Sequence, residues 1–309
     1  TRVAALGDRT GGAAPPQGDF VLVASTSEAY AHLFRLLCDP GDEVVAPRPS
    51  YPLFEPLAAL EGVRVESYRL SYGDRWTLDL DSLEAALSPR TRAVLLVQPN
   101  NPTGSCLSAE EIARVESLCA ERGLAIISDE VFGDFPWPPA VEPLPSLLGE
   151  RRTLTFVLGG ISKLCGMPQM KLGWIGLAGP APAKRDALRG LEWIADLFLS
   201  VATPTQLALP RFLEARHGFQ GRVRARLGTN LARLQSLGKK RGGIRALEGV
   251  GGWSAVVATS ATSPDFALTA LREQNEIDVI NGEAWAERAR EAERERDALR
   301  AVAKAAQVF

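Results

Sequence analysis

Histidine is scarce in this sequence of 309 residues, which contains only His32 and His217. Both lie in segments that we expect to be helical, which disfavours a histidine-based catalytic triad or a metal site with several histidine ligands. We therefore expect no bound metal. Any proton transfer must rely on lysine, aspartate, tyrosine or cysteine side chains.

Long apolar runs and an excess of charge of one sign are also missing. No apolar run reaches the roughly 18 residues that span a bilayer. The 35 Lys and Arg residues nearly balance the 37 Asp and Glu residues, which gives a formal net charge of −2. This balance favours neither nucleic acid nor a membrane surface as a partner.

Cysteine is sparse, and its pattern bears on location. The four cysteines are scattered without CxxC spacing, which is typical of reduced thiols in a cytosolic protein. Residues 1–20 lack the basic-then-apolar pattern of a secretory signal. We therefore expect a cytoplasmic protein.

Strand-like and helix-like segments alternate along most of the chain, which predicts an α/β fold with a mostly parallel sheet and helices on both faces. Ligands of such sheets bind beyond the carboxyl ends of the strands. A short helix is expected to begin at an Asp81 cap, and a helix over 108–122 at the capping-box pair Ser108 and Glu111. Later elements are expected at 183–201 and 204–237 (helices), 252–258 (strand), 264–274 (helix), 277–280 (strand) and 283–306 (helix).

Two segments near the start could bind parts of one cofactor. Ser25, Thr26 and Ser27 open a helix, where hydroxyls and free backbone N–H groups can bind a phosphate, although an ordinary helix cap explains them too. Tyr51, within Arg-Pro-Ser-Tyr-Pro, could stack on a heteroaromatic ring or simply be a core tyrosine.

Three further segments follow apolar strands. Asn101 lies in an Asn-Asn-Pro-Thr-Gly turn, and its amide could donate to a phenolate oxygen, although the turn needs no function to explain it. Asp129 ends an apolar strand, where a carboxylate needs a cationic partner such as a protonated pyridine nitrogen. Lys163, in a Gly-flanked loop, could form a Schiff base or be a surface lysine.

The segments Asn-Pro-Thr-Gly at 101–104, Asp-Glu-Val at 129–131 and Ser-Lys at 162–163 resemble the class I/II aminotransferases, which are fold-type I pyridoxal-phosphate (PLP) enzymes. The resemblance runs from about residue 21 to 174. It implies a three-layer PLP-transferase-like large domain over 1–200, connecting helices over 201–237 and a smaller α+β domain over 238–309. It also implies a homodimer.

The resemblance assigns roles residue by residue. Lys163 matches the lysine that binds PLP and later moves the substrate proton, and Asp129 matches the partner of the pyridine nitrogen. Asn101 matches the donor to the O3′ oxygen of PLP, and Tyr51 matches the aromatic residue on its ring. The remaining cofactor-binding positions are Ser25, Thr26, Ser27, Phe132, Ser162 and Lys171.

Some positions depart from the family pattern. Phe132 stands where a tyrosine commonly donates to O3′, Gly160 lacks a hydroxyl often found there, and Lys171 replaces a phosphate-binding arginine. Gly251-Gly252-Trp253 resembles the turn that opens the small domain, but beyond residue 280 no carboxylate-binding arginine is recognisable. The resemblance therefore suggests a shortened or altered member.

The function implied is a PLP-dependent aminotransferase that moves an amino group between an amino acid and a 2-keto acid. A PLP-dependent lyase is an alternative, because the cofactor residues do not fix the reaction. A non-catalytic PLP-fold protein with a regulatory or interaction role is a second alternative.

Overall fold

The computed structural model describes residues 17–241 and 244–259. An eight-stranded sheet dominates this part of the chain, in the order β1-β8-β7-β6-β5-β2-β3-β4. The pairs from β3 through β2, β5 and β6 to β7 are parallel, whereas β8 and β4 pair antiparallel to their neighbours. The predicted mostly parallel α/β sheet is therefore confirmed. Its strands are β1 (Phe20–Val23), β2 (Glu43–Arg48), β3 (Arg64–Tyr72), β4 (Trp76–Leu78), β5 (Thr91–Val97), β6 (Ala125–Asp129), β7 (Thr155–Gly160) and β8 (Gly173–Ala178).

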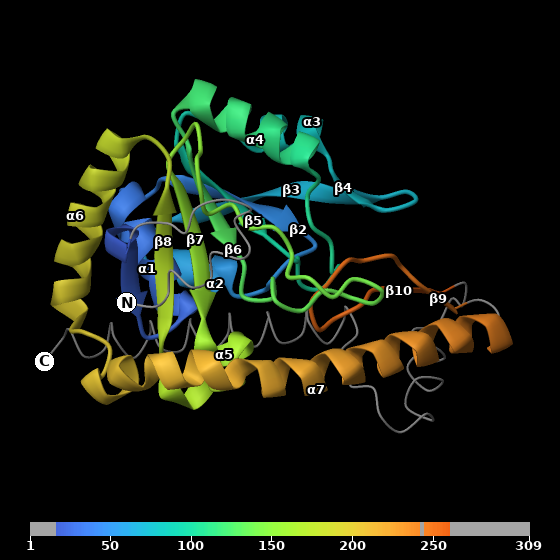
Figure 1. Ribbon diagram of the computed structural model, residues 1–309. Helices are drawn as coiled ribbons and strands as arrows, with labels where there is room; N and C mark the ends of the chain where they lie inside the picture. The colour runs from blue at the N-terminus through green and yellow to red at the C-terminus, as the bar shows by residue number, and fades with distance from the viewer. Residues whose placement is uncertain (1–16, 242–243, 260–309) are drawn as a thin grey trace, which may run out of the picture.

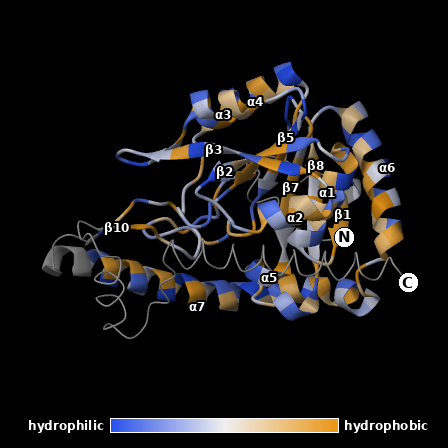
Figure 2. Ribbon diagram, turned by 180° about the vertical axis from the view of Figure 1, so that it is seen from behind, coloured by the Kyte–Doolittle hydropathy of each residue, from blue (hydrophilic) through white to orange (hydrophobic). Residues whose placement is uncertain are grey.

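Helices cover both faces of this sheet (Figure 1). One core cluster packs α1 (Thr26–Leu37), α2 (Phe54–Leu60) and α6 (Ala181–Phe198) against one face. A second packs α3 (Leu80–Ala86) and α4 (Ala109–Arg122) against the other. The central strands are hydrophobic, whereas α4 and α6 alternate between hydrophobic and hydrophilic residues (Figure 2). This pattern is that of helices with one buried face.

Local sequence signals explain where two of these helices begin. In α4, the Ser108 hydroxyl accepts from the Glu111 N–H at 3.2 Å, and the Glu111 carboxylate accepts from the Ser108 N–H at 2.8 Å. The predicted capping box is thus confirmed. For α3 the prediction was wrong by two residues, because Asp79, not Asp81, accepts from the Ser82 N–H as the helix cap.

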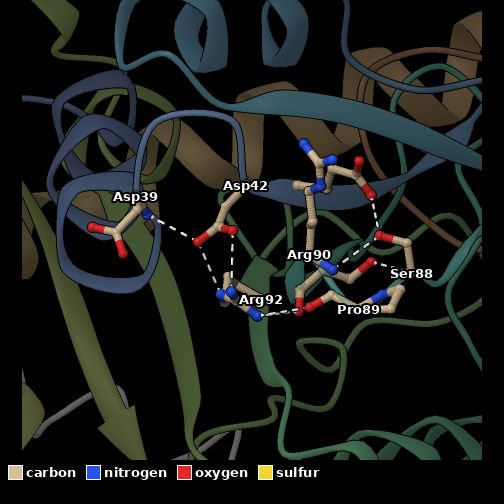
Figure 3. Close-up of polar contacts among 8 residues, drawn as sticks. Asp39, Asp42, Ser88, Pro89, Arg90 and Arg92 are labelled. Atoms are coloured by element: carbon tan, nitrogen blue, oxygen red, sulfur yellow. Dashed lines mark hydrogen bonds and ion pairs between the residues drawn. The ribbon is translucent and has the colours of Figure 1, made fainter.

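A charged network fixes the amino ends of β2 and β5 (Figure 3). The Arg92 guanidinium donates to both oxygens of Asp42, at 2.9 and 3.1 Å, and to the Pro89 carbonyl at 3.1 Å. Asp42 also accepts from the Asp39 N–H at 3.0 Å. This network lies at the edge of the sheet opposite the strand carboxyl ends, so it stabilises the scaffold away from the candidate site.

The long helix α7 (Thr203–Arg241) leads to a two-stranded sheet of β9 (Ile244–Ala246) and β10 (Val257–Thr259). A short helix α5 (Ile161–Leu164) lies beside α7 (Figure 1). The predicted strand over 252–258 was mostly wrong, since only its last two residues belong to β10. The elements expected at 264–274, 277–280 and 283–306 lie outside the described residues. Among the helices of the described residues, none combines the length and the hydrophobicity of a membrane-spanning segment.

The turn at Gly249–Gly252 docks onto the Asn-Pro-Thr-Gly turn. The Gly104 carbonyl accepts from the N–H groups of Val250, at 2.7 Å, and Gly251, at 3.1 Å. Gly104 has a φ of +68°, and a Cβ there would lie 2.8 Å from the Gly251 carbonyl oxygen. Glycine is therefore required at 104 both by the backbone conformation and by this close contact.

Gly104→Ala is expected to destabilise the protein more than Gly123→Ala. Gly123 has nearly the same φ, +66°, but a Cβ there would meet nothing within 4 Å. Both changes force alanine into the left-handed region, at roughly 1–2 kcal/mol; overpacking adds about 1–3 kcal/mol at Gly104 only. Urea unfolding of the two variants measures the difference. Equal losses would show that the Gly249–Gly252 turn does not pack on Gly104.

Candidate active site

Strand register brings three predicted segments to one edge of the sheet. Gly173, at the start of β8, pairs with Val23 at the end of β1 and with Gly160 at the end of β7. The chain runs from Val23 into Ser25–Ser27 and from Gly160 into α5, which carries Lys163. The amino end of α1 and the lysine of α5 therefore lie at the same edge.

The next strands place the other predicted residues at this edge. Asp129 is the last residue of β6 and pairs with Val97, the last residue of β5, and with Leu158 in β7. Asn101 lies in the turn that begins a few residues after β5, and it is half-buried. Parallel strands thus bring Asp129 and Asn101 to the carboxyl edge, as the sequence predicted.

The amino end of α1 offers a group of donors. Ser25 caps the helix by accepting from the Glu28 N–H at 3.2 Å, and Thr26 and Ser27 are half-buried at its first turn. The first N–H groups of a helix have no partners within it, and its dipole favours an anion there. A Cβ at Gly173 would lie 3.0 Å from the Gly159 carbonyl oxygen and 3.4 Å from the Ser25 carbonyl carbon, so β8 passes close to both β7 and this turn.

Lys163 faces aromatic rings. Its amine nitrogen lies 5.5 Å from the ring centre of Trp253 and 6.0 Å from that of Phe132. These two rings are 5.3 Å apart, and Phe135 and Phe219 pack against Trp253. Aromatic rings therefore border the amine on this side.

Asp129 is a buried carboxylate with an altered acidity. Burial raises the pKa of Asp129 from 3.8 to about 6; its hydrogen bonds from the Val131 N–H and the Tyr30 hydroxyl, and the Lys163 charge, oppose that rise. The charge of Lys163 thus reaches Asp129. Tyr51 is half-buried, and burial together with the Asp129 charge raises its pKa. Tyr51 and Lys163 are therefore each within electrostatic reach of Asp129.

The sequence profile of the family described as "Aminotransferase class I and II" matches residues 6–287. The chain belongs to this family. Family members use PLP, so the confirmed resemblance makes PLP the cofactor to test against the geometry.

Two curated relatives illustrate the similarity of this aminotransferase family member to known proteins. Glutamate-pyruvate aminotransferase AlaA of Escherichia coli (strain K12) is 31% identical over 196 residues, which are 62% of this chain and 47% of that protein. An S-alkyl-thiohydroximate lyase of Arabidopsis thaliana is 31% identical over 205 residues, 63% of this chain and 43% of that protein. The chain spans about half the length of the curated relatives it matches.

A solved structure supports the fold. Alanine aminotransferase from Pyrococcus furiosus aligns with a TM-score of 0.73 at 22% identity, covering 85% of this chain and 67% of that one. At this identity the match shows the shared fold. It agrees with the parallel sheet and the flanking helices described above.

The donor set fits PLP. The amino end of α1 suits the phosphate, the buried acceptor Asp129 suits a protonated ring nitrogen, and the half-buried Tyr51 offers an aromatic face. Lys163 supplies a primary amine at the same edge. Bound there, PLP would supply an electron sink for chemistry at the substrate α-carbon.

Other predicted residues are placed less decisively. Ser162 is the second residue of α5 and is half-buried. Lys171 lies two residues before β8 with an exposed side chain, in the left-handed conformation at φ 49°. It is near the correct edge, and its predicted contact with the phosphate stays a prediction.

Three residues of this region were missed in the sequence. Asn100 donates to the Pro49 carbonyl at 3.0 Å and accepts from the Ser50 hydroxyl at 3.0 Å, so it ties the loop before Tyr51 to the Asn101 turn. Trp253 reaches Lys163 from a distant segment, and Tyr30 contacts Asp129. Asn100 and Trp253 could have been found because they lie in or beside the Asn-Pro-Thr-Gly and Gly-Gly-Trp motifs. No sequence signal distinguishes Tyr30 from a core residue.

Proposed function

We propose that this protein is a PLP-dependent aminotransferase that moves an amino group between an amino acid and a 2-keto acid. The observation that carries the proposal is the meeting of Lys163 and Asp129 at the carboxyl edge of the sheet, beside the amino end of α1. Family membership and the aminotransferase names of relatives support the same activity.

The residues have distinct proposed tasks. Lys163 would hold the cofactor through its amine and would carry a proton at the substrate α-carbon. Asp129 would pair with a protonated ring nitrogen, and Asn101 would donate to the ring oxygen. Tyr51 covers the ring, while Ser25, Thr26, Ser27, Ser162 and Lys171 bind the phosphate. Phe132 and Trp253 exclude water from the Lys163 amine on the side that they enclose.

We also propose that the protein acts as a cytoplasmic homodimer. Large apolar side chains on α6 and α7 and between them are exposed, which a second copy would cover. Trp193 is 75% exposed, Leu197 76%, Leu199 80% and Leu207 76%. All four cysteines lie in the described part of the chain and none forms a disulfide, which suits a reducing compartment.

A double-substrate assay tests the activity. The full chain, supplied with PLP, is expected to convert a keto acid into its amino acid only when an amino-acid donor is present. The two half-reactions are expected to show ping-pong kinetics. Donors to compare include alanine and glutamate, with pyruvate or 2-oxoglutarate as acceptor.

Two results would contradict the aminotransferase proposal. Release of a keto acid or thiol from one amino-acid substrate, without any acceptor, would indicate a lyase, the activity named for one of the relatives. PLP binding without any turnover across the donor panel would indicate the non-catalytic alternative.

A further inference from the structure

Tyr30 is a buried polar residue beside the proposed cofactor. It lies on α1, one turn after Thr26, and its side chain is 1% exposed. Its hydroxyl donates to the Oδ2 oxygen of Asp129 at 3.1 Å, across 99 positions of sequence. A hydroxyl in an apolar core needs such a partner, because a buried polar group without a hydrogen bond destabilises the fold.

The Asp129 carboxylate is held at both oxygens. Oδ1 accepts from the Val131 N–H at 3.2 Å, while Oδ2 accepts from the Tyr30 hydroxyl. One contact comes from Asp129's own loop and the other from α1, which packs on the sheet. Together they restrict rotation of the carboxylate, and each oxygen keeps further acceptor capacity.

The core fixes the position of the Tyr30 ring. It packs edge-on against Phe54 at 5.2 Å and tilted against Phe34 at 5.9 Å. Phe54 also contacts Tyr51 at 5.8 Å. These contacts restrict the Tyr30 ring and link it, through Phe54, to Tyr51, which is proposed to cover the cofactor ring.

We propose that Tyr30 is a positioning residue for Asp129, whose hydroxyl holds the carboxylate oriented and ionised for pairing with a protonated ring nitrogen of the cofactor. The inference rests on the proposed function. It assigns to Tyr30 a task that the motifs of the sequence do not reveal.

The electrostatics agree with this role. Burial and the nearby Asp129 carboxylate raise the pKa of Tyr30 well above its ordinary value, so the phenol keeps its proton and remains a donor. The bond favours the charged form of Asp129 against the burial that raises the carboxyl pKa to about 6. Without this donor, Asp129 would hold its proton to a higher pH and pair less well with a cation.

Tyr30→Phe tests the proposal, because it removes only the hydroxyl. The full chain is titrated with PLP and with a PLP analogue in which carbon replaces the ring nitrogen. A loss of one charge-assisted bond corresponds to about tenfold or more. The variant is therefore expected to bind PLP about tenfold more weakly and the analogue almost unchanged.

Tyr68→Phe is the matched control. Tyr68 is equally buried at 1% exposed, but its hydroxyl donates to the Leu95 carbonyl at 2.9 Å within the core on the other face of the sheet. It should lose comparable stability without changing the ratio of the two affinities. If the ratio of the affinities for PLP and for the analogue were the same in Tyr30→Phe as in the wild type, the proposed role of Tyr30 would be wrong.

A second measurement does not depend on the cofactor. In the full chain labelled with carboxyl-¹³C aspartate, the Asp129 signal, assigned by its loss in Asp129→Asn, reports that carboxyl's titration. Tyr30→Phe is expected to raise the Asp129 pKa by about one unit, and Tyr68→Phe to leave it in place. If the Asp129 pKa did not rise in Tyr30→Phe, the proposal would be overturned.

The failure of the proposed function is distinguishable from that of the inference. If the wild type bound PLP and its carbon analogue equally well, Asp129 would not pair with the ring nitrogen, and both proposals would fail. If the wild type discriminated between them and Tyr30→Phe discriminated to the same degree, only the role of Tyr30 would fail.

Discussion

Replacing Lys163 with alanine is expected to abolish covalent attachment of PLP and to lower amino-group transfer by about 10²–10⁴-fold or more, the range for loss of a positioned acid–base group. In the wild type, borohydride reduction should leave a phosphopyridoxyl group on the peptide that contains Lys163. Mass spectrometry of the digested protein checks its position. The effect is large because one side chain holds the cofactor and moves the proton.

Lys184→Ala is the control for this experiment. Lys184 lies on α6, where it forms an ion pair with Asp19 at 2.5 Å. Its replacement should leave the adduct and the turnover in place. An adduct found on Lys171 or Lys184 in the wild type would show that Lys163 is not the anchor.

Asp129→Asn is expected to stabilise the cofactor-free protein at neutral pH while impairing PLP binding. The folded-state pKa of Asp129 is raised from 3.8 to about 6, chiefly by burial. The unfolded chain therefore loses this proton at a lower pH, and stability falls as pH rises from about 4 to about 6. Two pKa units correspond to about 3 kcal/mol, a cost that the neutral asparagine avoids.

Urea unfolding at pH 5 and pH 8 measures this effect without PLP. The advantage of Asp129→Asn over the wild type should grow with pH, and saturating PLP should reverse the order, since a bound cation partner stabilises the ionised wild-type carboxylate. If the difference in free energy of unfolding between Asp129→Asn and the wild type did not change with pH, the raised pKa of Asp129 would be refuted.

Asp42→Asn is a control in which the expected change in stability has the opposite sign, because the pKa of Asp42 is lowered and not raised. The Asp39 N–H and the Arg92 guanidinium hold the pKa of Asp42 below its usual range. A lowered carboxyl pKa gives stability that is present at neutral pH and is lost as pH falls through the folded pKa. Asp42→Asn should therefore destabilise the protein at pH 8, in the network of Figure 3.

The central residues of the proposed site were predictable from the sequence because they lie in short motifs at strand ends. Lys163, Asp129 and Asn101 each lie at or shortly after the end of an apolar strand, and parallel strands bring their carboxyl ends to one edge. The structure places these residues at that edge. Their bonds to a cofactor stay predictions.

Residues that act through long-range packing were not predictable in this way. Tyr30 lies on an amphipathic helix, where a tyrosine is ordinarily a core side chain, and its partner is 99 positions away. Trp253 reaches Lys163 because the Gly249–Gly252 turn is anchored by hydrogen bonds to Gly104 and Phe135. Neither contact leaves a periodic pattern or a spacing in the sequence.

The sequence by itself determined the α/β class, the family and the positions of Lys163 and Asp129, because hydrophobic periodicity and motif residues are local properties of the chain. Only the tertiary structure decided what surrounds them: the Tyr30 hydroxyl on Asp129 and the aromatic rings around Lys163. The altered acidity of Asp129 belongs to that second group. It arises from burial and from the charges and hydrogen bonds of neighbouring elements, and these exist only once distant segments have packed together.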